Sequence, residues 1–354
     1  MYETIEFSNF RSIKSLKIEN LKRINLFVGK NNCGKTSILE GLFLLSGASN
    51  PNSVATPNIL RGYKPIDKTF WEILFSDLDV SKNINLKSEI MAKNGIKRTK
   101  ELSITPILQS TLLDTTEIEH FIKNSNEQNR LINGVELKYY KDNNKNPTIS
   151  KIKNQNGLIE FDSAKDYELD CSCMFITPRP IENIGIFIDS IIRNKNKDKI
   201  IKILQKIEPK ITDITILSNG IVNVDIGLNT LVPINILGDG IIKTLSILAM
   251  IINAQNGMVL IDEIENGLDR ISQTILWEAI FEASKEFNVQ IFATTHSIEF
   301  LNNAIKVINE LKLNVTKEEI FKLYRIEKKE DRTKAINYGF EILEASLNSG
   351  SEVR

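Results

Sequence analysis

Hydrophobic and polar residues alternate over the first 20 residues, and the pattern then changes twice before residue 45. The segments TIEFSNF (4–10) and RSIKSLKIEN (11–20) alternate with a period of two, which is typical of half-buried strands. The mostly apolar INLFV (24–28) follows, and then SILEGLFLL (37–45) has apolar residues at helical spacing. We therefore predict two antiparallel strands, a buried parallel strand and a helix, in that order.

Between residues 46 and 176 the pattern is first irregular and then strongly β. Residues 46–57 (SGASNPNSVATP) are polar and contain two prolines, which predicts a loop, and FWEILF at 70–75 is apolar enough to pack on the core. From about residue 80 to 176, short β-like segments are separated by turn-like sequences. This predicts an antiparallel lobe of strands, interrupted by a short helix near residues 111–131.

After residue 176 the pattern alternates between helices and strands. Two prolines in ITPRPIEN (176–183) precede a helical segment at 184–209, and residues 211–236 favour short strands. A buried apolar helix follows the turn at 237–240, and buried strands are predicted at 258–261 and within 288–296, with an amphipathic helix at 270–287 between them. The remainder, 302–354, predicts a helix, two strands and a C-terminal helix. Such alternation indicates an α/β fold.

The segment GKNNCGKT, from Gly29 to Thr36, has the phosphate-loop spacing GxxxxGK[ST] between the predicted strand and helix. Gly29 and Gly34 let the backbone curl so that successive N–H groups point into one concavity, and the helix adds its positive N-terminal end. We expect Lys35 to reach the β- and γ-phosphates and the Thr36 hydroxyl to bind Mg²⁺. The sequence thus predicts ATP and Mg²⁺ as cofactors.

Two further strands end in candidate catalytic residues. Residues 258–261 lead into Asp262 and Glu263, and the predicted strand IFATT leads into His296. The carboxyl ends of parallel strands form the ligand-binding edge of an open α/β sheet. We expect Asp262 to hold Mg²⁺ and Glu263 to act as the general base for the attacking water, while His296 donates a hydrogen bond near the γ-phosphate.

A second glycine turn, Gly238-Asp239-Gly240, begins the apolar helix before residue 258. A glycine-rich turn at a helix N-terminus is a potential anion site. Because one nucleotide has one set of phosphates, we expect this turn to bind the nucleotide held by a second subunit. Arg11, in the turn between the first two strands, is either a solvated turn residue or a residue near the phosphates.

Composition and charge argue against several classes of protein. Lys+Arg and Asp+Glu both total 45, so the net charge of zero gives no bulk attraction to nucleic acid or to an anionic membrane. No apolar run reaches membrane-spanning length, and the N-terminus has no signal-peptide core. Three cysteines, Cys33, Cys171 and Cys173, do not make a disulfide framework. We expect a cytoplasmic protein with no membrane partner.

Five short segments resemble, in their order along the chain, the motifs of ABC-type ATPase heads. They are GKNNCGKT, LGDG, VLIDE, NGLD and TTHS. Residues 7–42 are most similar to the SMC, RecF and OLD (overcoming lysogenization defect) branch. The resemblance implies an α/β P-loop NTPase fold, namely an ABC-type head with a mixed parallel and antiparallel core sheet, an antiparallel β lobe and a helical signature lobe. We expect one domain over 1–354. The N-terminal strands and Walker A would lie in 1–79, and the β lobe in 80–176. A helical and short-strand insertion would follow in 177–236, and the signature, Walker B, switch histidine and C-terminal segment in 237–354.

The same resemblance assigns roles to individual residues. It implies two heads that enclose two ATP molecules, with Asp262 and Glu263 as Walker B and His296 as the switch histidine. The residues implied to bind ATP are Arg11, Asn31, Asn32, Cys33, Gly34, Lys35, Thr36 and Ser37. The signature acting on the partner's nucleotide would be Gly238, Asp239, Gly240 and Lys243, with Asp269 in the D-loop.

Some features depart from the family pattern. Gly238 stands where transporter-type signatures have serine, and neither Gln109 nor Gln155 is a convincing Q-loop glutamine, which argues against a transporter subunit. The chain has no long heptad arms, and the 58 residues after His296 are too few for the Toprim nuclease of OLD proteins. It therefore resembles a stand-alone OLD-like ATPase, a type often encoded beside a separate effector in bacterial anti-phage defence systems.

Two functions remain open from the sequence. The first is an ATP-hydrolysing regulatory protein, not itself a nuclease, whose ATP-dependent dimer or larger homo-oligomer controls a separate effector protein, for which a nuclease is the expected class. The alternative is a RecF-like DNA-repair or DNA-binding ATPase, for which the basic runs KNGIKRTK (93–100) and RNKNKDK (193–199) are candidate contacts. Such runs are more often solvated faces than binding sites.

Overall fold

The computed structural model describes most of the chain. It leaves out residues 66, 68, 93–94, 109–131, 143, 156–157, 164–170, 180, 182, 219, 312–315, 330–331 and 350–354. The helix expected near 111–131 lies outside the described residues. In the part that is described, no helix combines the length and apolar character needed to cross a bilayer.

A six-stranded sheet forms the centre of the molecule, in the order β16-β15-β3-β14-β13-β9. Its strands are β3 (Ile24–Val28), β9 (Cys173–Ile176), β13 (Met258–Ile261), β14 (Gln290–Thr294), β15 (Phe321–Lys329) and β16 (Arg332–Tyr338). All neighbouring pairs are parallel except β15 and β16, which form an antiparallel hairpin. The predicted mixed α/β core is therefore confirmed.

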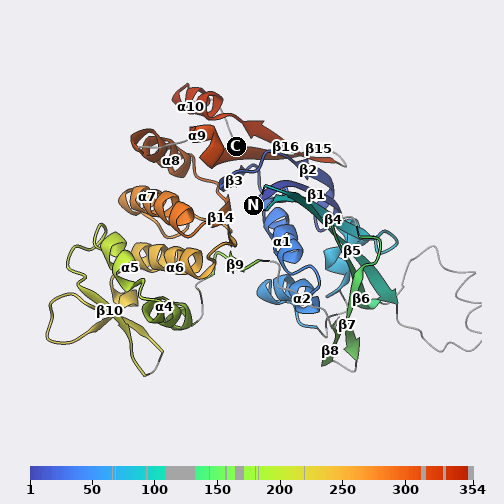
Figure 1. Ribbon diagram of the computed structural model, residues 1–354, viewed down its shortest axis with the longest axis horizontal. Coiled ribbons are helices and arrows are strands. Elements are labelled where there is room, and N and C mark those ends of the chain that lie inside the picture. Colours follow the sequence, from blue (N-terminus) through green and yellow to red (C-terminus); the bar gives the residue numbers. More distant parts are fainter. Residues whose placement is uncertain are drawn as a thin grey trace, which may run out of the picture.

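A second, antiparallel sheet of seven strands lies to the right of the core sheet in Figure 1, in the order β2-β1-β4-β5-β6-β7-β8. Its strands are β1 (Tyr2–Phe10), β2 (Ile13–Ile18), β4 (Ile84–Met91), β5 (Lys97–Leu108), β6 (Ile132–Lys141), β7 (Thr148–Gln155) and β8 (Leu158–Asp162). The predicted lobe is thus extended by the first two strands of the chain, because β1 pairs with β4.

Helix α1 (Lys35–Ser46) lies between the two sheets, and ten of its twelve residues are buried. A helix with most of its surface buried needs neighbours on nearly all sides, which is consistent with its central place. The core strands alternate between two hydrophobic clusters. In β13, Val259 and Ile261 pack with the helices on one face, whereas Leu260 packs toward α1 on the other. The period of two in these short strands sets both layers of the core.

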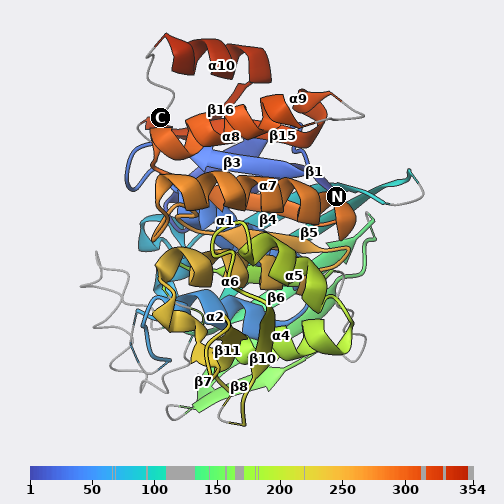
Figure 2. The ribbon, with the colours of Figure 1, turned by 90° about the vertical axis from the view of Figure 1, so that its left-hand side faces the viewer.

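The opposite face of the core sheet is covered by helices. Figure 2 shows α6 (Asp239–Asn253), α7 (Arg270–Glu286) and α8 (Ile298–Glu310) side by side over it. A helical lobe extends from α6 and consists of α4 (Ile184–Arg193), α5 (Lys197–Leu204), β10 (Asp213–Ile216), β11 (Val222–Asp225), β12 (Val232–Pro233) and the 3₁₀ turn Ile234–Ile236. Helices α9 (Lys317–Ile320) and α10 (Phe340–Asn348) flank the C-terminal hairpin.

The loop predicted over residues 46–57 is wrong. Residues Pro51–Leu60 form helix α2, followed by the 3₁₀ turns Glu72–Leu74 and Ser76–Leu78. Both prolines misled the prediction for physical reasons. Pro51 occupies the first turn, where no N–H is needed, and the Asn50 side chain caps the helix by accepting from the N–H of Asn52. Pro57 lies inside the helix and costs it one backbone hydrogen-bond donor.

Three other predicted elements are corrected. Strand β9 belongs to the parallel core sheet and not to the antiparallel lobe, because it pairs with β13. The single helix predicted over 184–209 divides at Asn194–Asn196 into α4 and α5, with Lys195 at φ 56°. The strand predicted near 231–236 is reduced to two residues followed by a 3₁₀ turn.

Gly41 lies where α1 packs closely against the antiparallel sheet. A Cβ atom at this position would lie 2.6 Å from the Phe7 ring of β1, so α1 approaches the antiparallel sheet too closely for alanine. We expect Gly41→Ala to lower the free energy of unfolding by about 1–3 kcal/mol despite its higher helix propensity. Chemical denaturation measures the change. Gly47→Ala, where a Cβ meets only ordinary contacts, is the control, and equal stability of both variants would contradict the prediction.

Candidate functional site

The phosphate loop joins β3 to α1 and is held against the C-terminal hairpin. Gly29 has φ 143°, and a Cβ there would lie 2.4 Å from the carbonyl oxygen of Ile326 in β15. Gly34, with φ 105°, is the residue before the first turn of α1. Both glycines are required, since a side chain at either would be strained and the first would collide with backbone. The loop therefore curls around the N-terminus of α1 as the sequence predicts.

Lys35 is a buried cation at the start of α1. Its Nζ donates to the carbonyl oxygens of Gly29 at 2.9 Å and Lys30 at 3.0 Å, so the side chain folds back over the loop. Burial lowers the pKa of Lys35, although the acids Asp262 and Glu263 act in the opposite direction. The Lys35 Nζ also lies 3.9 Å from the Cys33 sulfur. A buried ammonium group with no carboxylate among these three contacts would be stabilised by an anionic ligand.

A chain of hydrogen bonds connects α1 to β13 and β14. The Thr36 hydroxyl donates to Oδ2 of Asp262 at 2.9 Å, and the Thr294 hydroxyl donates to Oδ1 at 2.6 Å. Thr294 Oγ1 also accepts from the backbone N–H of Glu263 at 2.8 Å. Hydroxyl and carboxylate oxygens are the ligands that Mg²⁺ prefers, so Thr36 and Asp262 fit the expected metal. Thr294 fixes the orientation of the carboxylate from behind.

Glu263 and His296 lie at the ends of adjacent strands, since β13 and β14 are parallel neighbours. Glu263 has φ 48°, and its Oε2 accepts from Nδ2 of Asn266 at 2.6 Å. The backbone N–H of His296 donates to Oε1 of Glu265 at 2.7 Å. Glu265 therefore holds the turn that carries His296 against the turn that carries Glu263. The predicted adjacency of these two strands is confirmed.

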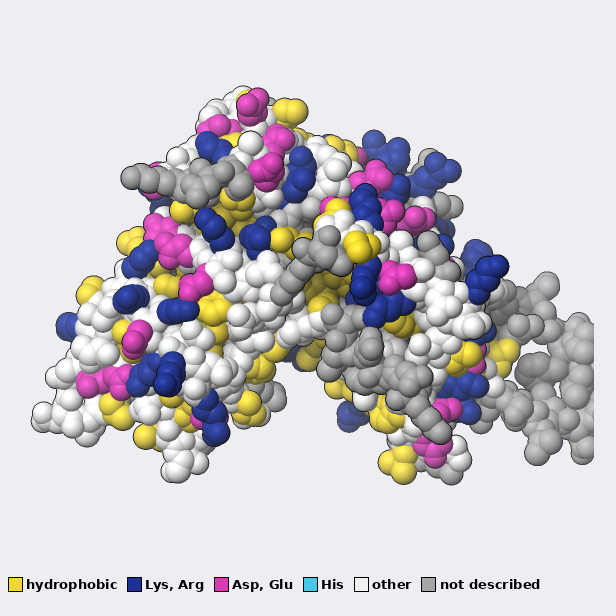
Figure 3. Space-filling model, in the orientation of Figure 1, with side chains coloured by type: hydrophobic (Ala, Val, Ile, Leu, Met, Phe, Trp, Pro, Cys, Tyr) yellow, Lys and Arg dark blue, Asp and Glu magenta, His cyan; other side chains and the backbone are white. Residues whose placement is uncertain are grey.

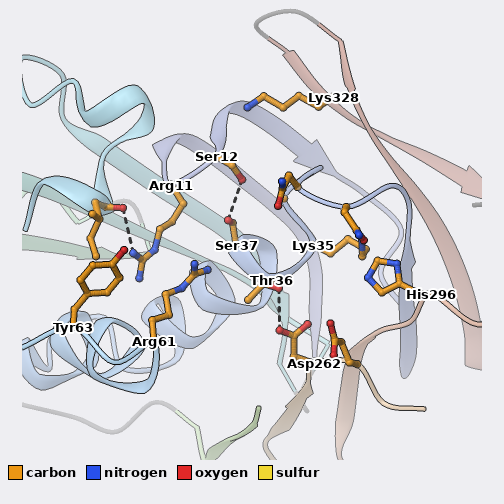
Figure 4. Close-up of a pocket in the computed structure, with 15 residues that line it drawn as sticks. Arg11, Ser12, Lys35, Thr36, Ser37, Arg61, Tyr63, Asp262, His296 and Lys328 are labelled. Atoms are coloured by element: carbon orange, nitrogen blue, oxygen red, sulfur yellow. Dashed lines mark hydrogen bonds between the residues drawn. The ribbon is translucent and has the colours of Figure 1, made fainter. Parts of the chain in front are cut away.

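One cavity of about 680 Å³ brings the predicted residues together (Figure 4). The predicted residues that line it are Arg11, Asn31, Asn32, Gly34, Lys35, Thr36, Ser37, Asp262, Glu263 and His296. Side chains that the sequence did not indicate also line it, namely Ser12, Arg61, Tyr63, Ile73 and Lys328. Cations outnumber the two acids, and Asp262 lies beside Thr36, so the cavity is suited to a polyphosphate with a bound metal.

The other predicted residues do not line this cavity. The Cys33 side chain is buried among the hydrophobic residues around α1, and burial raises the pKa of its thiol. Gly238 and Asp239 are exposed at the start of α6, and a Cβ on Gly240 would lie 2.8 Å from the Ser272 hydroxyl. The Asp269 carboxylate caps α7 by accepting from the N–H groups of Ile271 and Ser272. The glycine turn thus rests on the Asp269 turn, away from the chain's own phosphate loop.

Lys243 does not line the cavity, but it interacts electrostatically with acids that do. It lies one turn into α6, and burial lowers the pKa of its ammonium group. The acids Glu265, Asp262 and Glu263 of the same chain counteract that effect, so its charge acts on the acidic end of the cavity. This electrostatic influence within one chain was not anticipated from the sequence, which assigned Lys243 only to a partner's nucleotide.

The residues missed by sequence reasoning differ in how readily they could have been found. Ser12 follows Arg11, and its hydroxyl lies 3.1 Å from that of Ser37, so the same turn could have indicated it. Thr294 lies two residues before His296 within the TTHS segment. Arg61 and Tyr63 gave no signal, because they follow a helix that the sequence analysis took for a loop. Lys328 comes from β15, far from any motif.

Comparisons with known proteins agree on the class of fold. Residues 24–302 match the family described as "AAA domain, putative AbiEii toxin, Type IV TA system". An ATP/GTP phosphatase of Helicobacter pylori is 25% identical over 348 residues, which cover 88% of this chain and 89% of that protein. The DNA replication and repair protein RecF of Hahella chejuensis is 52% identical, but over 46 residues that cover only 13% of this chain and 12% of RecF.

Solved structures show the same architecture at low sequence identity. The SMC head domain from Thermotoga maritima has a TM-score of 0.51 at 11% identity and covers 96% of this chain and 99% of that one. A structure of the SmcHead bound to the C-winged helix domain of ScpA has a TM-score of 0.50 at 14% identity, with 96% and 98% covered. The fold is therefore that of an SMC-head-like P-loop ATPase, as the sequence predicts.

Thr294 provides a test of the hydrogen-bond chain. We expect Thr294→Val to weaken Mg²⁺-dependent ATP binding or turnover by about 10–100-fold, because the Asp262 carboxylate loses the partner that orients it. Calorimetric titration with ATP, with and without Mg²⁺, measures the effect, which should be confined to the Mg²⁺ titration. Thr274→Val, on the exposed face of α7, is the control. Equal loss in the absence of Mg²⁺ would contradict a role in metal binding.

Proposed function

This chain belongs to the family described as "AAA domain, putative AbiEii toxin, Type IV TA system", and from that premise we propose that it is an ATP-hydrolysing regulatory protein. The observation that carries the proposal is the hydrogen bond of 2.9 Å between Thr36 and Asp262, in a cavity that also contains Lys35 and Glu263. It joins a phosphate loop to a candidate metal ligand that lies 226 residues away in sequence.

The proposed chemistry follows from the positions of these side chains. Lys35 and the loop N–H groups would hold the β- and γ-phosphates, and Thr36 and Asp262 would hold Mg²⁺, which would neutralise charge on the phosphates. Glu263 orients and deprotonates the attacking water. His296, whose turn is held by Glu265, donates to the γ-phosphate. The relative named as an ATP/GTP phosphatase, similar over most of both chains, supports hydrolysis.

We propose that ATP joins two copies of the chain. Gly238 and Asp239 are exposed at the N-terminus of α6, and the turn Gly238–Gly240 does not line its own chain's cavity. A second subunit's nucleotide is therefore the ligand we assign to this turn. Asp269 and Lys243 belong to the same proposed interface. The Asp269 turn supports the glycine turn through Ser272, whose hydroxyl donates to Asp269 at 2.8 Å.

The proposed role of the dimer is to control a separate effector protein in anti-phage defence, as a stand-alone OLD-like ATPase. The family description, which names a toxin of a toxin–antitoxin system, supports a two-component arrangement. Exposed large hydrophobic residues gather on the helical lobe and suit a protein partner. They are Ile186, Leu217, Ile221, Leu228, Leu231 and Ile236. A nuclease is the class of effector we expect.

A RecF-like role on DNA is the alternative, supported by the short match to RecF around the phosphate loop. The basic runs offer it little support. Lys97 pairs with Glu3, Arg193 with Asp189, and Lys197 with Asp213. On the face drawn in Figure 3, cationic and anionic side chains are interspersed and form no continuous basic band. Salt-dependent DNA binding by the purified protein would favour this alternative over an effector.

Two substitutions separate binding from chemistry. We expect Lys35→Ala to lose ATP binding, because the phosphates lose their buried cation, and Glu263→Gln to bind ATP and lose turnover by about 10²–10⁴-fold. Equilibrium binding and phosphate release measure the two effects. Lys285→Ala and Glu282→Gln on the exposed face of α7 are matched controls. Wild-type turnover by Glu263→Gln would show that Glu263 is not the base.

The native mass of Glu263→Gln tests the proposed assembly. With Mg·ATP we expect two chains of 40.2 kDa each, and without nucleotide one, because ATP completes the interface and the variant cannot consume it. Light scattering coupled to size-exclusion chromatography gives the mass, and Asp239→Trp, at an exposed position of the same turn, should prevent the increase. A mass that is the same with and without ATP would contradict an ATP-dependent dimer, whether that mass is one chain or many.

A further inference from the structure

Glu265 links the turn after β13 to the turn after β14. Its side chain is partly buried, and its Oε1 accepts from the backbone N–H of His296 at 2.7 Å. The two residues are 31 positions apart in sequence. Nearby, the N–H of Ile264 donates to the carbonyl oxygen of Thr294 at 3.0 Å. Glu265 thus ties the turn of the candidate general base to the turn of the candidate switch histidine.

The N–H of His296 lies between two segments whose backbone is already held. On one side, the N–H of Thr295 donates to the carbonyl oxygen of Phe27 in β3 at 3.1 Å. On the other side, the N–H of Ser297 donates to the Thr295 hydroxyl at 3.1 Å, and the Ser297 side chain caps α8. His296 belongs to neither the strand nor the helix, so its N–H needs an acceptor from elsewhere in the chain. Glu265 supplies that acceptor.

The direction of this N–H influences the direction of the His296 side chain. The N–H and the Cα of one residue lie in the same rigid peptide plane, so the hydrogen bond to Glu265 limits how that plane can turn. His296 lines the nucleotide cavity together with Lys35 and Asp262 (Figure 4). A side chain that donates to a reacting phosphate has to be placed within about 0.5 Å of its working position. Loss of the Glu265 contact would let the peptide rotate and displace the ring.

The second oxygen of Glu265 is buried at a cost in free energy. Oε2 makes no hydrogen bond to any residue that the structure describes. A contact that served stability alone would favour a neutral acceptor, because a buried carboxylate oxygen without a donor is destabilising. Nearby cations offset part of this cost. Burial lowers the pKa of Lys243, and Glu265 is the strongest of the charges that oppose that effect. Uncompensated buried polar groups of this kind are typical of functional sites.

We propose that Glu265 is a positioning residue that directs His296 toward the γ-phosphate. Its carboxylate holds the peptide of His296 from the turn after β13. Glu265 does not line the nucleotide cavity formed by the described residues, so it acts through His296 and not by contact with the nucleotide. The inference rests on the proposed function and adds to it a residue to which the sequence analysis assigned no role.

The experiment separates turnover from binding. Glu265→Ala should lower kcat by about 10–100-fold, because the imidazole loses its fixed direction, and should leave the Kd for Mg·ATP within about twofold. Glu265→Gln should recover most of the rate, since an amide oxygen can accept from the same N–H. Phosphate release and calorimetric titration measure the two quantities. Glu282→Ala, which removes an exposed carboxylate from α7, is the matched control.

A double-mutant cycle shows whether Glu265 acts through His296. We expect His296→Ala to lower kcat, and Glu265→Ala to lower it by no more than about a further twofold in that background. Losses that multiply would show that Glu265 acts independently of His296, which contradicts the inference. Full turnover by His296→Ala would contradict it as well.

The remaining outcomes separate this inference from the proposed function. If the wild type hydrolyses ATP and Glu265→Ala does so at the same rate, the inference is wrong and the proposed function stands. A loss of ATP binding as large as the loss of turnover, with a lower melting temperature, would assign Glu265 a structural role and also overturn the inference. Absence of ATP hydrolysis by the wild type would overturn the proposed function and, with it, this inference.

Discussion

The candidate site depends on one constraint, the parallel alignment of β3, β14 and β13 at their carboxyl ends. The phosphate loop, the Asp262–Glu263 pair and His296 each follow one of these strands. Since β14 lies between the other two, Thr294 at its end reaches Asp262, and Asp262 reaches Thr36. A shift of one residue in either pairing would turn these side chains to the opposite face of the sheet. Register therefore determines whether a site exists at all.

Packing on both faces holds that register. Helices α6 to α8 cover one face, while α1 and the antiparallel sheet cover the other, so that β3, β13 and β14 are buried throughout. On the α1 side, Gly41 of α1 packs closely against Phe7 of β1, and Gly29 of the phosphate loop packs closely against Ile326 of β15. The phosphate loop is thus supported by the first strand of the chain and by a hairpin near its C-terminus.

The charges around the cavity suit the anionic ligand with a bound metal that we propose for it. Lys35 contacts neutral carbonyl oxygens, and Arg11 and Arg61 share the single carboxylate of Glu40. At the other end, Asp262 and Glu263 are close enough to influence Lys35 and Lys243. Desolvation makes each of these charges more expensive to leave unpaired than it would be in water. The same site also explains why α1 contains a buried Glu40 where an apolar residue would be expected.

The sequence by itself determined the parts of the site whose chemistry is encoded in adjacent residues. Local patterns identified the segment GKNNCGKT between a strand and a helix, the acids after residues 258–261 and the histidine after β14. Local patterns also identified the α/β class and most strands of the antiparallel lobe. Tertiary structure decided the rest. Helix α2 forms although its sequence resembles a loop, β9 joins the core sheet because β13 offers it an edge, and Arg61 reaches the cavity only because α2 packs beside α1. The physical reason is that burial, edge pairing and a shared carboxylate depend on partners more than 20 residues away in sequence, which no local pattern of hydrophobic and polar residues records.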